Sequence, residues 1–306
     1  MKTKFVSFFI ALFLVYFLTQ TSAFAGAWTV AQYKVWAELY TKFAWSKWDY
    51  NEKSEKVRKS NDARSWSWEM EPKFEYGVTD WLNALFSFSY IEAHYKEYAR
   101  PPANGPYSVM NNGVKSITYG AKWRLAKEPV VASVQGKIYQ YTFYDNPYGN
   151  GSVEGQPGIG RGDDAFELRG LLGKTFDLPL IVNDIQLPCY VGLESGYRWR
   201  NRDVANDIPF FAEFGFWPYK WLLLKAEIDG YKAHPGTGIA QSYAIWRVGM
   251  VWQVFGVSTT RKNQAFNFEV QYGQTFWGKG GSGDTDVQGS VVNNGQEIVF
   301  KLQTLF

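Results

Sequence analysis

Apolar and polar residues alternate along most of the chain. Residues 66–76 read WSWEMEPKFEY, with large apolar side chains at every even position except Pro72 and with serine or charged side chains at the odd positions. A repeat of two residues is typical of a β-strand with one apolar and one polar face. The environment of each face then decides which kind of β-protein this is.

The same alternation recurs along the chain, with turn-rich sequence between the segments. The predicted strands cover residues 33–48, 65–76, 81–93, 115–125, 130–143, 165–176, 185–199, 208–217, 221–230, 242–255, 265–277 and 296–306. These twelve segments follow one another too closely to leave room for crossover helices. We therefore predict an all-β fold with antiparallel neighbours.

The predicted connections alternate between long and short. Long polar segments such as 51–63, 96–113, 144–163 and 278–295 follow odd-numbered strands, and short segments such as 77–80, 126–129 and 218–220 follow even-numbered strands. Long loops at one end and short turns at the other are typical of an up-and-down barrel of the bacterial outer membrane. We predict a twelve-stranded antiparallel transmembrane β-barrel with both termini at the short-turn end. The alternative is a soluble β-sandwich or lipocalin-like barrel.

The size of the barrel and its aromatic residues favour the membrane. Twelve strands enclose more volume than side chains readily fill, so an apolar lining would leave a large dry void. The apolar faces are therefore expected to point outward to lipid and the charged faces inward to water. Tryptophan and tyrosine also gather at two levels, as at the two interfaces of a membrane. Trp81, Trp123, Trp217, Trp221 and Trp252 lie near the short turns, and Trp45, Trp66, Tyr90, Trp246 and Trp277 lie toward the long loops.

The first 25 residues are predicted to be a secretory signal peptide. Lys2 and Lys4 precede an apolar run over residues 5–18, and the small-residue pattern Ala23-Phe24-Ala25 follows it. The run is shorter than the ~20 residues of a membrane-spanning helix, which disfavours a retained anchor. Residues 26–306 then form the barrel. Only residues 26–32 precede the first strand, so we expect no plug and passive movement of solutes.

Composition excludes several classes of function. The chain of 306 residues has a net charge of only +3, which gives no reason to expect a nucleic-acid partner. The single cysteine, Cys189, cannot form an intrachain disulfide and is expected to be a small apolar side chain on a strand. We predict no cofactor.

The two histidines limit catalytic interpretations. His94 follows Glu92 on the outward face near the long-loop end, where an outer-membrane lipase could hold a catalytic histidine, but serines such as Ser89 fall on the opposite face. We therefore interpret His94 as a solvated residue and His234 as a loop residue. The carboxylates of Asp163-Asp164 and of residues 283–286 could attract calcium, but are expected to be solvated loop charges.

The interior carries the candidate functional residues. On each predicted strand, the positions that alternate with the apolar ones are expected to face the lumen. They carry these charged side chains: Lys34, Glu38, Lys42, Glu69, Glu71, Lys73, Glu75, Lys122, Arg124, Lys137, Arg169, Glu194, Arg198, Lys225, Glu227, Arg247 and Glu269. Together with the further inward residues Lys301, Glu167, Glu213, Asp229 and Glu297, the acids and bases balance, so neighbouring strands can pair opposite charges. Two interpretations remain open: a hydrated pore, which residues 144–163 could narrow by folding inward, and a closed interior linked by salt bridges.

Aromatic side chains accompany the charges on the inward faces. They are Trp36, Tyr40, Tyr139, Tyr141, Tyr190, Phe211 and Tyr243, which offer planar or sugar-like solutes faces to stack on or else pack between strands.

One hairpin resembles a known family. Residues 71–80, EPKFEYGVTD, followed by the alternating residues 82–90, resemble the hairpin of outer-membrane barrels of the phenol-degradation (MetA-pathway) transporter type. The resemblance covers about one hairpin and implies a transport-type barrel for hydrophobic or aromatic compounds. It carries over no binding residues.

The sequence thus predicts an outer-membrane channel for small solutes that acts without catalysis. The alternatives are an outer-membrane enzyme acting on lipid and a structural or surface-binding barrel with a closed lumen. Phe306, an aromatic residue on the closing strand, resembles the signal read by the outer-membrane assembly machinery. The other expected partners are outer-membrane lipid and lipopolysaccharide.

Overall fold

A computed structural model describes residues 26–100, 105–141, 163–179, 186–201, 204–234, 240–256, 265–280 and 292–306. Its strands are β1 (Val35–Tyr50), β2 (Lys56–Arg58), β3 (Arg64–Gly77), β4 (Leu82–Arg100), β5 (Gly105–Ala126), β6 (Val131–Gln140), β7 (Ala165–Pro179), β8 (Gln186–Arg200), β9 (Asp207–Tyr219), β10 (Leu222–Ala233), β11 (Ser242–Gly256), β12 (Ala265–Lys279) and β13 (Val292–Leu305). A short 3₁₀ turn, η1 (Ser60–Asp62), precedes β3. In this part of the chain, no helix is long and apolar enough to cross a membrane.

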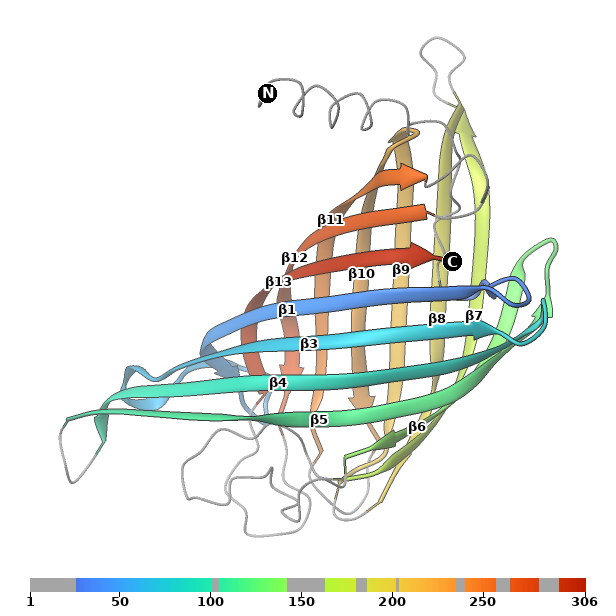
Figure 1. Ribbon diagram of the computed structural model, residues 1–306. Helices are drawn as coiled ribbons and strands as arrows, with labels where there is room; N and C mark the ends of the chain where they lie inside the picture. Colours follow the sequence, from blue (N-terminus) through green and yellow to red (C-terminus); the bar gives the residue numbers. More distant parts are fainter. Residues whose placement is uncertain are drawn as a thin grey trace, which may run out of the picture.

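The long strands close into a barrel. Each pairs antiparallel with its neighbours in chain order, and β13 pairs with β1 from Trp36↔Leu305 to Tyr50↔Val292. In Figure 1 the front wall of β1, β3, β4 and β5 crosses the back wall of β7 to β10 steeply, as strongly tilted barrel strands do. The predicted twelve-stranded barrel is confirmed, and β2 is a short addition paired with the end of β1.

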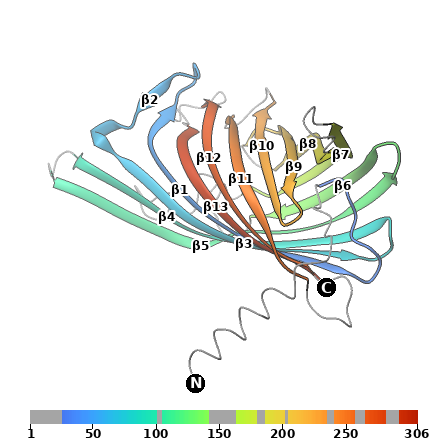
Figure 2. The same cartoon turned by 90° about the horizontal axis from the view of Figure 1, so that it is seen from above.

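One predicted loop is wrong. Residues 96–113 were expected to form a long connection, but β4 continues to Arg100 and β5 begins at Gly105, with pairs such as Lys96↔Ser108 between them. Figure 2 shows this hairpin extending away from the rest of the barrel. Polar residues there hid the strand because a strand beyond the membrane needs no apolar face. Residues 144–162 and 283–286, for which an inward fold and a calcium site were considered, lie outside the described residues.

Apolar side chains cover the outer wall. Large apolar residues from many strands are exposed there, including Leu39, Phe43, Phe74, Phe86, Leu172, Leu193, Ile228, Val248, Met250 and Leu302. On the same strands the charged residues of opposite parity, such as Glu69 and Arg247, are buried. This is the reverse of a soluble barrel and confirms the predicted direction of the two faces.

Four residues of the predicted aromatic belts, Trp66, Trp81, Trp123 and Trp221, are exposed. Trp81 and Trp123 lie against each other on the outer wall with ring centroids 5.1 Å apart, near the short turns. Trp217 was placed in the same belt, which is wrong: it packs against Tyr190 in a buried apolar cluster. Near the end of β9 the inward face is apolar. Trp217 therefore points inward because of its alternating position along β9, although its residue type is typical of the outer belt.

The segment before β1 lies against the inner wall at the short-turn end. Ala27, Thr29 and Val30 are buried, and Ser133 on β6 donates a hydrogen bond to the Ala27 carbonyl at 2.5 Å. At the β3–β4 turn, Thr29 donates to the Asp80 carbonyl at 2.8 Å, and Gly77 allows close contact because a Cβ there would come 2.1 Å from the Ala31 oxygen. Residues 26–30 therefore pack inside the short-turn end of the barrel, and the expected absence of a plug domain stays a prediction. The predicted signal peptide lies outside the described residues.

Candidate functional site

Ion pairs line the inner wall of β1, β3 and β5. The Glu69 carboxylate lies 2.7 Å from the Lys42 ammonium and 2.6 Å from that of Lys115. Lys73 lies 3.0 Å from Glu38. Glu69 is buried, so both of its partners are needed to offset the cost of removing the carboxylate from water.

A second group of ion pairs surrounds Lys225 on β10. Its ammonium lies 2.7 Å from Glu213, 2.9 Å from Glu269 and 3.3 Å from Glu227. Lys301 adds a second cation at 3.2 Å from Glu269. One buried lysine thus links carboxylates from β9, β10 and β12.

Arg247 on β11 organises the neighbouring carboxylates. Its guanidinium lies 2.5 Å from Glu297, 2.9 Å from Glu227 and 3.2 Å from Asp229. Glu227 therefore connects the Arg247 group to the Lys225 group. The planar guanidinium is suited to several carboxylates at once.

Glu167 on β7 is the centre of a third group. The carboxylate is fully buried and lies 2.6 Å from both Arg169 and Arg198. Arg169 also reaches Glu194 at 3.2 Å. The expectation that Asp163 is a solvated loop charge is wrong, because it is fully buried and lies 2.6 Å from Arg200.

The pattern of partners shows that these groups point inward. Lys225 on β10 reaches Glu269 on β12, Arg247 on β11 reaches Glu297 on β13, and both contacts pass over an intervening strand. Side chains converge in this way only on the concave face of a curved sheet. The contacts therefore lie in the lumen.

Two cavities occupy the lumen beside the ion pairs. One of about 430 Å³ is lined by residues from opposite walls, including Lys42, Glu69, Lys225 and Arg247. The other, of about 400 Å³, is lined by residues of β1, β3 to β6 and β8, including Lys122 and Lys137. Glu38, Glu71, Lys73, Glu194, Trp36 and Gly26 line both cavities. The two spaces therefore adjoin along one side of the barrel.

The sequence-predicted lumen residues do not all join the network. Glu75 pairs with Lys122 at 2.6 Å, and Glu71 lies 3.7 Å from Lys73. Of the described residues, none forms an ion pair with Lys34, Arg124 or Lys137. Lys34 precedes β1 and Arg124 lies at the short-turn end of β5, whereas Lys137 lines the lumen cavity.

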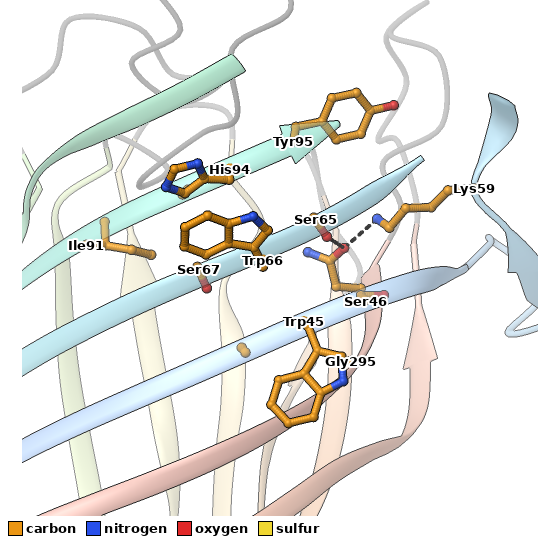
Figure 3. A pocket seen from close by; sticks show the side chains of 13 residues that line it. Trp45, Ser46, Lys59, Ser65, Trp66, Ser67, Ile91, His94, Tyr95 and Gly295 are labelled. Carbon is orange, nitrogen blue, oxygen red and sulfur yellow. Dashed lines mark hydrogen bonds between the residues drawn. The ribbon is translucent and has the colours of Figure 1, made fainter. Parts of the chain in front are cut away.

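A further cavity of about 350 Å³ lies near the long-loop end (Figure 3). It forms where adjacent strands carry small inward residues: Ala44, Ser46, Ser65, Ser67, Ala93 and Gly295. Lys59 spans its edge, 2.6 Å from Asp49 and 2.7 Å from the Asn293 side-chain oxygen. The small side chains therefore leave space beside the inner wall at this end.

His94 is not the solvated residue that the sequence predicted. Its ring stacks on Trp66 at 3.4 Å between centroids, as Figure 3 shows, and lies 2.6 Å from Glu92. Its direct cross-strand neighbours are Trp66 and Met110, neither of which is a nucleophile. The stacked pair forms part of the outer aromatic belt.

The short-turn end of the lumen is apolar, which sequence reasoning missed. Trp28 packs against two buried clusters, one of Ala27, Val131 and Leu171 and one of Tyr190, Leu223 and Val251. The signal was present in Leu222-Leu223-Leu224, where apolar residues occupy both faces of a strand. An apolar side chain that faces inward at a strand end indicates that another apolar group packs against it inside the barrel.

Comparison with known proteins gives one solved structure that shares the fold. No family model and no curated protein matches the sequence. Among solved structures, an outer membrane channel from Pseudomonas putida F1 is similar, with a TM-score of 0.58 and 13% identity over 94% of this chain and 100% of that one. The transport unit of the autotransporter AIDA-I from Escherichia coli follows, with a TM-score of 0.43 and 11% identity over 94% and 92%. A Pseudomonas aeruginosa FadL homologue has a TM-score of 0.38 and 10% identity over 89% and 90%.

The first of these shares the closed barrel along its whole length. A closed barrel with an apolar outer wall between two aromatic belts is the architecture of bacterial outer-membrane proteins. The protein is an outer-membrane β-barrel. Its short turns then face the periplasm and its long loops the exterior.

Proposed function

We propose that the barrel is an outer-membrane channel through which small solutes pass passively along a narrow, charged lumen. The pair of adjoining cavities beside the ion-pair network carries this proposal. Charged groups in a wall retain water, and their pairing across strands leaves no strong overall preference for anions or cations. Lys137 adds a local positive charge to one cavity.

The lining favours small planar or sugar-like solutes with polar groups. Trp36, Tyr40, Phe211 and Tyr243 line the 430 Å³ cavity together with the charged residues. Aromatic faces bind flat apolar surfaces, and nearby charges orient the polar substituents. The resemblance at residues 71–80 favours aromatic compounds within this class.

Single-channel recording tests the proposal directly. Purified protein refolded into a planar bilayer should give discrete openings, and these should shrink when an aromatic solute enters from either side. The folded state is checked in parallel by its slower migration in unheated electrophoresis samples. Silent bilayers containing folded protein would instead favour a structural barrel with a closed lumen.

A lipid-modifying enzyme is the rival that involves His94. The His94–Glu92 contact of 2.6 Å on the outer wall is the observation that favours it. Under the channel proposal, His94→Ala leaves conductance unchanged. Release of fatty acid from outer-membrane lipid by the wild type, lost in His94→Ala, would support the enzyme instead.

We also propose lipopolysaccharide as a partner at the outer rim of β3 and β4. Arg64 and Lys96 are exposed direct cross-strand neighbours, 5.4 Å and 5.2 Å from the Tyr98 ring. Two cations placed opposite one another repel, so an anionic phosphate between them stabilises both.

Replacing both cations with glutamine should weaken lipopolysaccharide binding about tenfold or more, since each cation contributes about 1 kcal/mol. Titration of the detergent-solubilised protein with fluorescent lipopolysaccharide measures this. Lys220→Gln, in the exposed turn at the opposite end, is the matched control. Equal affinity in both variants would contradict the site.

A further inference from the structure

We infer that the α-ammonium group of Gly26, released by signal cleavage after Ala25, forms an ion pair with Glu194 inside the lumen and holds residues 26–30 as a plug. Hydrolysis of the Ala25–Gly26 peptide bond by water leaves a carboxylate on Ala25 and an amino group on Gly26, which takes up a proton. The new charge is then created at the place where the inner wall carries a carboxylate.

Contact between Gly26 and Glu194 is the observation that carries the inference. A Cβ built on Gly26 would lie 1.9 Å from Oε1 of Glu194 and 3.1 Å from its Cδ. The Gly26 Cα is therefore in contact with the carboxylate, and its amino nitrogen, one bond of ~1.46 Å away, lies within about 5 Å of Oε1. A small rotation of the terminal glycine brings the two charges together.

Among the described residues, no hydrogen-bond donor contacts Oε1 of Glu194. Its other oxygen, Oε2, accepts a hydrogen bond from Arg169 at 3.2 Å, while Oε1 faces Gly26. Arg169 is itself held by Glu167 at 2.6 Å, so the guanidinium does not depend on Glu194 for a partner. The Glu194 carboxylate can thus bind Arg169 through one oxygen and the Gly26 ammonium group through the other.

Donors on the inner wall hold the rest of the segment. Lys122 donates to the Gly26 carbonyl at 3.2 Å, and Ser133 donates to the Ala27 carbonyl. Gly173 admits the Trp28 ring, because a Cβ at that position would come 2.3 Å from the indole. The wall therefore holds a donor for each of these two carbonyls and leaves space for the indole, and Glu194 is the proposed partner of the ammonium group.

The ion pair also makes the plug dependent on cleavage. Before cleavage Gly26 carries an uncharged amide nitrogen, which cannot pair with Glu194. The segment therefore gains its strongest contact only in the exported, processed chain. The ion pair does not require that the barrel conduct; only the effect on solute flow rests on the proposed channel function.

The first test is the intact mass of protein purified from the membrane, which should correspond to a chain beginning at Gly26. Any other first residue overturns the inference. The second test exposes folded protein in detergent to an aminopeptidase and follows the loss of Ala27 and Trp28 by mass. Glu194→Gln should accelerate that loss about tenfold or more, the effect of removing a hydrogen bond to a charged group.

Two further variants separate the ion pair from general loosening of the barrel. Glu71→Gln removes another carboxylate from the same lumen, one that is not among the atoms nearest Gly26, and should leave the wild-type rate. Inserting Gly-Ser between Ala25 and Gly26 moves the ammonium away from Glu194 and should match Glu194→Gln. The combined variant should show no additional effect, because both changes remove one interaction.

Additive effects, or equal rates in Glu194→Gln and wild type, would overturn the inference. None of these readouts requires conduction. A protected terminus in a silent barrel would disprove the channel and leave the ion pair standing, whereas an open barrel with an unprotected terminus would do the reverse.

Discussion

Glu167→Ala is expected to destabilise the barrel by about 3–5 kcal/mol, the cost of removing one partner from a buried ion pair. The Glu167 carboxylate is fully buried, 2.6 Å from Arg169 and 2.6 Å from Arg198. Without it, two guanidinium groups lose their principal buried partner. Asp207, at 3.6 Å from Arg198, and Glu194 compensate only in part.

Urea unfolding in lipid vesicles, followed by tryptophan fluorescence, measures the change in free energy. Glu71→Ala is the matched control, because its carboxylate is 23% exposed and lies 3.7 Å from Lys73, its one ionic partner among the described residues. That variant should lose no more than about 1 kcal/mol. Equal losses in the two variants would show that burial in the lumen does not determine the strength of these pairs.

The alternation of residue types was sufficient to predict the barrel. In β3 and β10 one parity is apolar and the other charged, so strand, register and direction of the faces follow from the same period of two. Each prediction of a lumen-facing charge, such as Glu69 or Arg247, needed only that parity. Pairs between neighbouring strands, such as Lys42–Glu69, follow from the register, but Lys225–Glu269 and Arg247–Glu297 could not be predicted because they join strands that are not neighbours.

The wrong predictions arose where one of the two environments changes. Beyond the membrane, β4 and β5 continue with polar residues on both faces, so the hairpin looked like a loop. At the short-turn end, Trp217 and Leu223 face an apolar interior, so residue type no longer indicates lipid. Both exceptions depend on the surroundings of the strand, water in one case and a packed apolar interior in the other. The alternation of residues along a single strand gives no information about these surroundings.

Trp28→Ala is expected to raise single-channel conductance severalfold by opening the short-turn end. The indole packs against both buried clusters there and fits against Gly173. Alanine removes the largest side chain of the segment, and the surrounding wall strands cannot collapse into the space because their pairing fixes their positions. The lumen should therefore widen where the Trp28 indole stands.

Trp221→Ala is the matched control for this experiment. Trp221 lies near the same end of the barrel but on the outer wall, where it is 40% exposed and stacks on Tyr219. Its loss removes an indole of equal size without changing the lumen, so conductance should stay at the wild-type value. Equal conductance in both variants would show that Trp28 does not limit flow.

Silent bilayers with both variants, while the folded state is intact, would contradict the channel itself. A rise confined to Trp28→Ala would place the main resistance at the amino-terminal segment rather than at the ion pairs, since these remain unchanged in both proteins.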